Sequence, residues 1–258
     1  MSVQLAFKEY GDGPPLLILH GLFGSSTNWR SIAKRLSADF RVFTVDLRNH
    51  GRSGWHEDMS YDVMANDVHN FMLENDIDRA TVLGHSMGGK TAMILAFKHS
   101  ELIDKLIIVD IAPVAYEHSH SAINKSMLEL DLNILANRKE ADTALARSIK
   151  DRPTRQFLLQ NLVAVNSHFS WRINLASIQQ NMDGLTGFPI NINDSRCDHK
   201  TLFVHGGNSD YLKLIHHSQI DRLFPNNEIV TIENASHWIH VEKPDALLDQ
   251  ITSFINKQ

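Results

Sequence analysis

Residues 79–99 have the sequence RATVLGHSMGGKTAMILAFKH, and this stretch decides the fold. A short apolar run leads into a Gly-x-Ser-x-Gly turn centred on Ser86, and apolar residues then recur at helical spacing. A serine on such a sharp strand-to-helix turn is strained, and only small neighbours such as Gly84 and Gly88 fit around it. The N–H groups that begin the next helix favour negative charge there. The stretch therefore predicts a nucleophile elbow, and the competing interpretation is a glycine-rich turn with an idle serine.

Short apolar runs typical of buried strands recur along the chain, with helical patterns between them. The runs are PLLILH at 15–20, RVFTVD at 41–46, TVL at 81–83, KLIIVD at 105–110, KTLFVH at 200–205 and EIVTI at 228–232. This alternation predicts an α/β fold with a mostly parallel sheet that is flanked by helices on both faces.

The alternation stops between residues 114 and 195, where no convincing strand is found and helical stretches such as 154–165 and 171–182 occur. We therefore predict one core domain, formed by residues 1–113 and 196–258, with residues 114–195 inserted as a helical cap. Such an insertion lies over the carboxyl ends of the strands, where open α/β sheets bind ligands.

Composition narrows the class of protein. The 258-residue chain has a formal net charge of −5, which disfavours binding to nucleic acid or anionic membranes. Its apolar runs are too short to span a membrane, and its start lacks the pattern of a signal peptide. The single cysteine, Cys197, suits a reducing compartment. We expect a soluble cytoplasmic protein.

Neither a metal nor a cofactor is expected. The fifteen histidines are scattered, without a His-Glu-x-x-His or Cys-x-x-Cys spacing. The glycine-bearing turn at 46–53 resembles a phosphate loop but lacks its Gly-Lys-Ser/Thr ending, so a hydrogen-bonded structural loop beside the site is the better interpretation.

A serine nucleophile requires a base and an orienting acid. His237 follows the last predicted strand, where a serine–acid–histidine order would place the base. His85 adjoins the serine but must point away from it, so it is expected to pack or form a hydrogen bond, and His240 is expected to be structural. Two aspartates end strands after the elbow: Asp110 and, one strand later, Asp210. The general pattern of this architecture favours Asp210.

Backbone amides are expected to form the oxyanion hole. One is the amide of Met87, directly after the nucleophile. The other comes from the glycine-containing loop at 20–24, with the Leu22 amide as the choice and Phe23 as the neighbouring alternative.

Together these motifs resemble the α/β-hydrolase superfamily and, more narrowly, the YbfF-like bacterial esterases. The resemblance covers nearly the whole chain and is weakest in the cap. It is carried by Gly-His-Ser-Met-Gly-Gly-Lys at 84–90, His-Gly-Leu-Phe-Gly-Ser at 20–25, Asp-Leu-Arg-Asn-His-Gly at 46–51, Val-Asp-Ile-Ala-Pro at 109–113, Gly-Gly-Asn-Ser-x-Tyr at 206–211 and His-Trp-x-His-x-Glu-Lys-Pro-Asp-Ala at 237–246.

This resemblance changes the choice of acid. In YbfF-like esterases the acid lies in the Val-Asp-Ile-Ala-Pro segment, which implies Asp110, and relatives need not carry an aspartate at the position of Asp210. The present chain has both, so Asp210 stays as the alternative.

The expected activity is hydrolysis of short- to medium-chain carboxylesters or thioesters of small molecules through an acyl-enzyme on Ser86. A lyase or C–C bond hydrolase would use the same residues mainly for proton transfer. A non-catalytic binding protein would keep the fold without the chemistry, because function lies in the site rather than in the fold.

Overall fold

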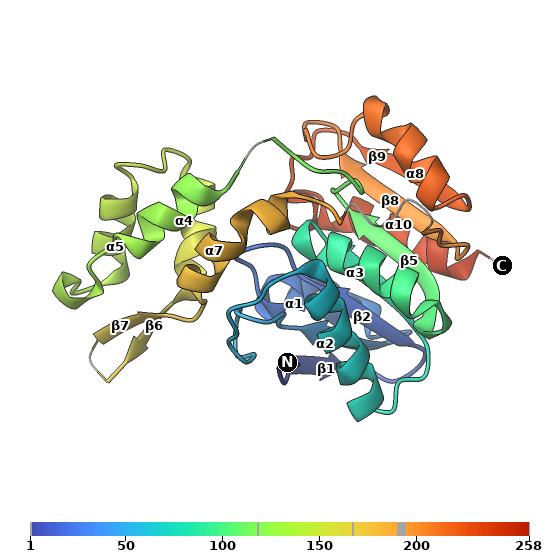
Figure 1. Cartoon of the computed structure of the whole chain (residues 1–258), viewed down its shortest axis with the longest axis horizontal. Helices are drawn as coiled ribbons and strands as arrows, with labels where there is room; N and C mark the ends of the chain where they lie inside the picture. The colour runs from blue at the N-terminus through green and yellow to red at the C-terminus, as the bar shows by residue number, and fades with distance from the viewer. Residues whose placement is uncertain (1, 118, 167, 190–194, 258) are drawn as a thin grey trace.

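The computed structural model describes residues 2–117, 119–166, 168–189 and 195–257. A central sheet with helices on both faces makes up one part of the molecule (Figure 1). A group of helices and a small hairpin, from the middle of the chain, lies beyond one end of this sheet.

The sheet has the strand order β1-β3-β2-β4-β5-β8-β9, and every neighbouring pair is parallel except the antiparallel pair β1–β3. Its strands are β1 (Phe7–Tyr10), β2 (Pro15–Leu19), β3 (Arg41–Val45), β4 (Ala80–His85), β5 (Ile103–Val109), β8 (Thr201–Gly206) and β9 (Asn227–Ile232). The predicted α/β class is therefore confirmed, and each strand predicted from an apolar run coincides with a strand of the sheet.

Helices cover both faces of the sheet, which explains why its central strands are almost wholly apolar. The helices α2 (Tyr61–Glu74), α3 (Met87–Lys98) and α8 (His217–Leu223) pack on one face. The helices α1 (Arg30–Leu36) and α10 (Pro244–Asn256) pack on the other, and the short α9 (Ile239–Glu242) precedes α10. Short 3₁₀ turns complete the core: η1 (Ser26–Trp29), η2 (Ser100–Leu102) and η6 (Leu214–His216).

Between β5 and β8 the chain leaves the sheet. This part contains α4 (Ser121–Leu128), η3 (Leu132–Ile134), α5 (Arg138–Leu145), α6 (Arg152–Leu158), η4 (Leu159–Asn161), β6 (Leu162–Val165), β7 (His168–Trp171) and α7 (Leu175–Thr186). Figure 1 shows α7 running from the hairpin back towards the sheet. Residues 118, 167 and 190–194 of the expected cap lie outside the described residues.

Three strands were not predicted, and the expectation that residues 114–195 contain no strand was wrong. The edge strand β1 was missed because its residues are mostly exposed and therefore carry no apolar pattern. The helices predicted at 154–165 and 171–182 overlap the antiparallel hairpin β6–β7, in which Leu162 pairs with Trp171. Strands of four residues are too short for periodicity to separate them from a helical turn.

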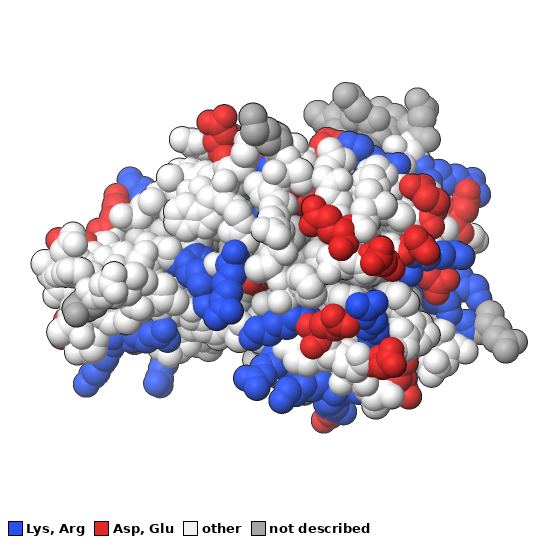
Figure 2. All heavy atoms as spheres, turned by 90° about the horizontal axis from the view of Figure 1, so that it is seen from below, with Lys and Arg blue, Asp and Glu red and all other residues white. Residues whose placement is uncertain are grey.

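No helix in the described ranges is long and apolar enough to cross a membrane. Figure 2 shows basic and acidic side chains close to one another on one face, beside large uncharged areas. This face therefore differs from the single-sign basic surface typical of proteins that bind nucleic acid.

Helix α3 lies close to the sheet, and the two glycines that follow its first residue permit this approach. A Cβ atom on Gly88 would run into the carbonyl groups of Leu19 and His20, at the end of β2. Gly184, in contrast, lies in α7 with nothing within 4 Å of where its Cβ atom would be. Both glycines lie in helices, so replacing each of them by alanine compares a crowded position with an open one.

We expect Gly88→Ala to destabilise the fold by about 2 kcal/mol or more, because rigid backbone must move. Gly184→Ala should stabilise it by about 0.5–1 kcal/mol, because alanine loses less entropy in a helix. Urea unfolding of the two variants beside the wild type measures both effects. A harmless Gly88→Ala would contradict the close approach of α3 to β2.

Candidate active site

Ser86 lies on the sharp turn between β4 and α3. Its backbone angles, φ 53° and ψ −118°, are rare for a residue with a side chain. The turn is fixed on both sides: the Ser86 amide donates to the Val109 carbonyl at 3.1 Å, and the Lys90 amide donates to the Ser86 carbonyl at 3.1 Å. The strained serine is thus held between β5 and the first turn of α3.

Asp110 follows β5 and is completely buried. Its Oδ1 atom accepts a hydrogen bond from the Gly206 amide at 2.9 Å, and its Oδ2 atom accepts one from the Ser209 hydroxyl at 2.5 Å. The same Oδ2 atom lies 2.6 Å from His237 Nδ1. Three donors from two separate segments, the end of β8 and the turn after β9, therefore satisfy one buried carboxyl group.

Asp210 lies elsewhere. Its side chain is 85% exposed, and its carboxylate pairs with Lys213 Nζ at 2.7 Å. Of the two aspartates that the sequence left open, Asp110 is the one in hydrogen-bond contact with His237.

Two contacts hold His237 in orientation besides the carboxylate. The Tyr211 ring stacks on its imidazole at 4.0 Å between centroids, with 24° between the planes. His85 Nε2 lies 2.9 Å from the His237 carbonyl oxygen and donates to it. Of the two roles expected for His85, packing or a hydrogen bond, the structure shows the hydrogen bond.

The tautomer of His237 follows from these contacts. Because the Asp110 carboxylate can only accept, His237 must carry a proton on Nδ1. In the neutral ring the Nε2 atom is then free of a proton and can act as a base. Ser86 and His237 line the same cavity, so this base faces the cavity of the elbow serine.

The two neighbouring amides of the loop after β2 that the sequence offered as oxyanion donors differ in their hydrogen bonding. The Phe23 amide donates to His50 Nε2 at 3.2 Å, and Phe23 has a left-handed φ of 61°. Within the described part of the chain, the amides of Leu22 and Met87 have no acceptor. These are the two amides that the sequence singled out for the oxyanion hole.

Two buried histidines support this loop, and the sequence did not indicate them. His20 Nε2 accepts from the Leu47 amide at 2.9 Å, so its Nδ1 atom donates to the Gly21 carbonyl at 2.8 Å. His50 Nδ1 donates to the Arg48 carbonyl at 2.9 Å. The segment 46–53 is thus the hydrogen-bonded structural loop that was predicted, and it anchors the loop at 20–24.

Ser209 and Tyr211 were also missed as site residues. Both belong to the segment after β8, and a signal for them was available in the topology. Strands β5 and β8 are adjacent and parallel, so the residues after β8 must lie beside Asp110 at the end of β5.

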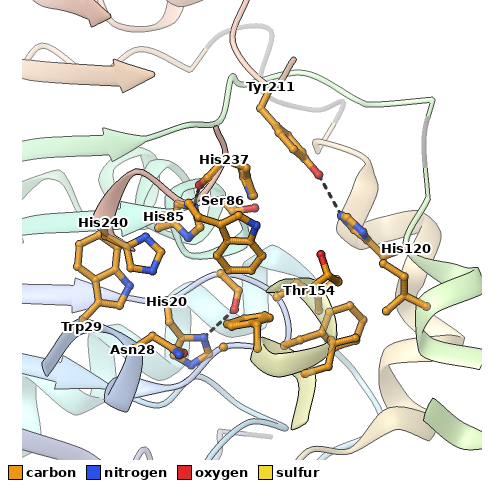
Figure 3. Close-up of a pocket in the computed structure, with 18 residues that line it drawn as sticks. His20, Asn28, Trp29, His85, Ser86, His120, Thr154, Tyr211, His237 and His240 are labelled. Carbon is orange, nitrogen blue, oxygen red and sulfur yellow. Dashed lines mark hydrogen bonds between the residues drawn. The ribbon is translucent and has the colours of Figure 1, made fainter. Parts of the chain in front are cut away.

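A cavity of about 190 Å³ opens above the elbow. Figure 3 shows Ser86, His85 and His237 on its core side, with His120 and Thr154 opposite. His120 Nε2 lies 3.1 Å from the Tyr211 hydroxyl. The remaining wall is largely apolar and includes Leu22, Phe23, Trp29, Ile123, Phe157, Leu158 and Trp238.

His240 also lines the cavity, but its ring is buried and stacks on Trp29 at 4.5 Å. Burial lowers its pKa to about 3, so the ring is neutral. This fits the structural role predicted for it. Among the described residues, no group of three or more His, Cys, Asp or Glu side chains could hold a metal ion.

The buried histidines at the loop 20–24 make the stability of the fold depend on pH in the acid range. Burial lowers the pKa of His50 to about 3 and also lowers that of His20, whereas a histidine of an unfolded chain titrates near 6.5. The stability that a neutral His50 provides is therefore complete above about pH 6.5 and is lost as the pH falls towards 3.

We expect His50 alone to remove about 1 kcal/mol of unfolding free energy between pH 6 and pH 5. Denaturant unfolding at a series of pH values tests this, with His50→Gln as the matched variant. The glutamine oxygen can still accept from the Phe23 amide but does not titrate, so the pH slope should become shallower. Equal slopes for both proteins would contradict the assignment.

Comparison with known proteins identifies the family. A family model described as the alpha/beta hydrolase fold matches residues 14–244. A mouse (Mus musculus) protein named sn-1-specific diacylglycerol lipase ABHD11 is 41% identical over 252 residues, which cover 94% of this chain and 81% of that protein. Esterase YbfF of Escherichia coli is 35% identical over 257 residues, covering 99% of this chain and 98% of that one.

Among solved structures, one named as a marine microorganism esterase superimposes with a TM-score of 0.95. It is 38% identical and covers 98% of this chain and 100% of its own. The predicted likeness to YbfF-like esterases is thereby confirmed. The chain belongs to the α/β-hydrolase family, as a serine hydrolase that acts on ester bonds.

Proposed function

We propose that this protein is a carboxylesterase or thioesterase that cleaves short- to medium-chain acyl esters of small molecules, with Ser86, His237 and Asp110 as its catalytic triad. One observation carries the proposal: the buried Asp110 carboxyl group lies 2.6 Å from His237 Nδ1, and His237 shares a cavity with the elbow serine. The esterases and lipases among its relatives support the same chemistry.

In the proposed first step, His237 Nε2 takes the proton of the Ser86 hydroxyl as the serine oxygen attacks the acyl carbon. The imidazolium that forms is stabilised by the Asp110 carboxylate. His237 then gives the proton to the leaving alcohol or thiol, and the acyl group stays on Ser86.

The negative oxygen of the tetrahedral intermediate would be bound by the amides of Leu22 and Met87. The hydrogen bond of the Phe23 amide to His50 supports Leu22 over its neighbour, because it leaves Phe23 without a free donor. The start of α3 adds its helix dipole at the same place.

Water completes the cycle. With the alcohol gone, His237 activates a water molecule that attacks the acyl-enzyme and releases the acid. Burial against Tyr211 and the proposed cap limits the solvent around this step, which strengthens each electrostatic interaction in the site.

Residues 114–195 are proposed to act as the cap over the site. Helix α6 supplies Thr154, Phe157 and Leu158 to the cavity wall, and α4 supplies Ile123. These side chains give the acyl ester an apolar surface. A reducing cytoplasmic location is proposed on the single, buried Cys197.

We expect the wild type to hydrolyse p-nitrophenyl esters, tested from acetate to decanoate, and Ser86→Ala to lose about 10⁴–10⁶ in kcat, because the nucleophile is gone. Release of p-nitrophenol is followed for both proteins, with melting curves to verify that the variant is folded. Full activity of a folded Ser86→Ala protein would contradict the proposed mechanism. Absence of wild-type activity on every ester would contradict the proposed substrates and favour a lyase or C–C bond hydrolase.

The two aspartates provide a matched test of the acid. Asp110→Asn should lower kcat by roughly 10⁴, because an amide no longer selects the productive histidine tautomer. Asp210→Asn should stay close to wild type, since its carboxylate is on the surface beside Lys213. The opposite result in the same ester assay would make Asp210 the acid.

A further inference from the structure

Two cavities, not one, meet at the nucleophile. Besides the cavity of about 190 Å³, a small chamber of about 30 Å³ also reaches Ser86. Leu22, His120 and Tyr211 line both spaces, so the His120–Tyr211 hydrogen bond of 3.1 Å lies at their boundary. Figure 3 shows these two side chains pointing towards each other.

The two spaces differ in which catalytic groups they contain. His237 lines only the large cavity, whereas Met87, whose amide is one of the two proposed oxyanion donors, lines only the small chamber. During acylation His237 must give its proton to the leaving oxygen. The alcohol half of an ester therefore belongs in the large cavity, on the side of His237.

The acyl half must then point elsewhere. At a tetrahedral carbon bonded to Ser86, with its oxygen held by the amides of Leu22 and Met87, the acyl substituent lies away from the leaving group. Both Leu22 and Met87 border the small chamber, and His237 does not line it. This geometry assigns the acyl group to the chamber.

The chamber is small. At about 10–15 Å³ for each water-sized group, its 30 Å³ admits roughly two or three heavy atoms beyond the carbonyl carbon. Tyr61 and Leu185 border it, and the Tyr61 hydroxyl donates to the Leu185 carbonyl at 2.6 Å. This bond ties α2 to α7 and fixes that part of the wall.

A buried lysine adds a polar boundary. Lys90 is 1% exposed, and its Nζ atom donates to the carbonyls of Thr186 at 3.0 Å and Gly187 at 2.5 Å. The ammonium also lies 4.7 Å from the centre of the Tyr116 ring. Burial lowers the Lys90 pKa to about 7. A long alkyl chain extending in this direction would press against a desolvated amine that is already bound.

The large cavity, in contrast, suits a bulky apolar group. The rings of Phe157 and Trp238 meet at 4.2 Å in its wall, beside Leu158 and Ile123. This wall offers apolar surface to whichever half of the substrate lies on the His237 side.

We propose that the enzyme prefers esters that join a short acyl group, of about two to four carbons, to a larger apolar alcohol, with the acyl group in the small chamber and the alcohol in the large cavity. The proposal rests on the proposed function and gives the two halves of its substrate separate sites.

Isomeric esters test it directly. Hexyl acetate and ethyl hexanoate contain the same atoms, and only the acyl and alcohol chain lengths are exchanged. We expect kcat/KM for hexyl acetate to exceed that for ethyl hexanoate by about tenfold or more, because one misplaced methylene already costs that much in an apolar pocket. Acid release is followed by titration at constant pH.

Two leucine variants test which cavity determines the preference for a short acyl group. Leu185 borders only the chamber and Leu158 only the large cavity. Leu185→Ala should raise the kcat/KM for ethyl hexanoate by about tenfold relative to that for hexyl acetate. Leu158→Ala should instead lower the kcat/KM for hexyl acetate relative to that for ethyl acetate. Ratios within one variant do not depend on the fraction folded, and Leu185→Val replaces Leu185→Ala if the latter does not fold.

The outcomes separate this inference from the proposed function. Hydrolysis that persists in Ser86→Ala would overturn the proposed function. Hydrolysis that depends on Ser86 but favours ethyl hexanoate, or a preference that Leu185→Ala leaves unchanged, would overturn only the assignment of the two cavities.

Discussion

The hydrogen bonds of the Asp110 carboxyl group hold the carboxyl ends of β5 and β8 and the turn after β9 together. A fully buried carboxylate is costly unless donors surround it. Here the donors are the Gly206 amide at the end of β8, the Ser209 hydroxyl beyond it, and His237 after β9. The end of β8 and the turn after β9 are therefore fixed relative to β5 by the need to satisfy one group. The position of His237 is a consequence of this requirement.

Buried polar groups are also satisfied by hydrogen bonds at the loop 20–24, where the partners are neutral. His20 and His50 each donate from one ring nitrogen to a carbonyl and accept a backbone amide on the other. Such a double role requires the neutral ring, which burial enforces by lowering both pKa values. Acceptance of the Phe23 amide by His50 leaves the neighbouring Leu22 amide uncommitted. His50 thus binds one of the two amides beside Ser86 that the sequence offered in this loop, while His20 ties the loop to Leu47.

The sequence was sufficient where one local pattern determined the structure. The central strands were predictable because burial on both faces makes them apolar throughout. Ser86 was predictable because its strained turn requires Gly84 and Gly88. The edge strand β1 and the hairpin β6–β7 were not, since neither has a buried face of its own that would impose a pattern.

The acid was ambiguous for a different reason. Asp110 and Asp210 both follow strands, and their difference in burial arises from contacts between segments about 100 residues apart. Only the resemblance to known esterases favoured Asp110 before the geometry was known. For His20, His50 and Ser209 no local pattern existed, because each acts through a partner that is distant in the sequence.

Lys90 shows how the fold can also limit the substrate. Its ammonium binds the carbonyls of Thr186 and Gly187, at the C-terminal end of α7, where the helix dipole favours a cation. This contact joins helix α3, which follows Ser86, to the end of the segment that returns from the proposed cap. The residues that close the small chamber are thus the residues that attach α7 to the core. Because Lys90 holds backbone carbonyls at the end of α7 and not its side chains, replacing Leu185 can change the size of the chamber while this attachment stays in place.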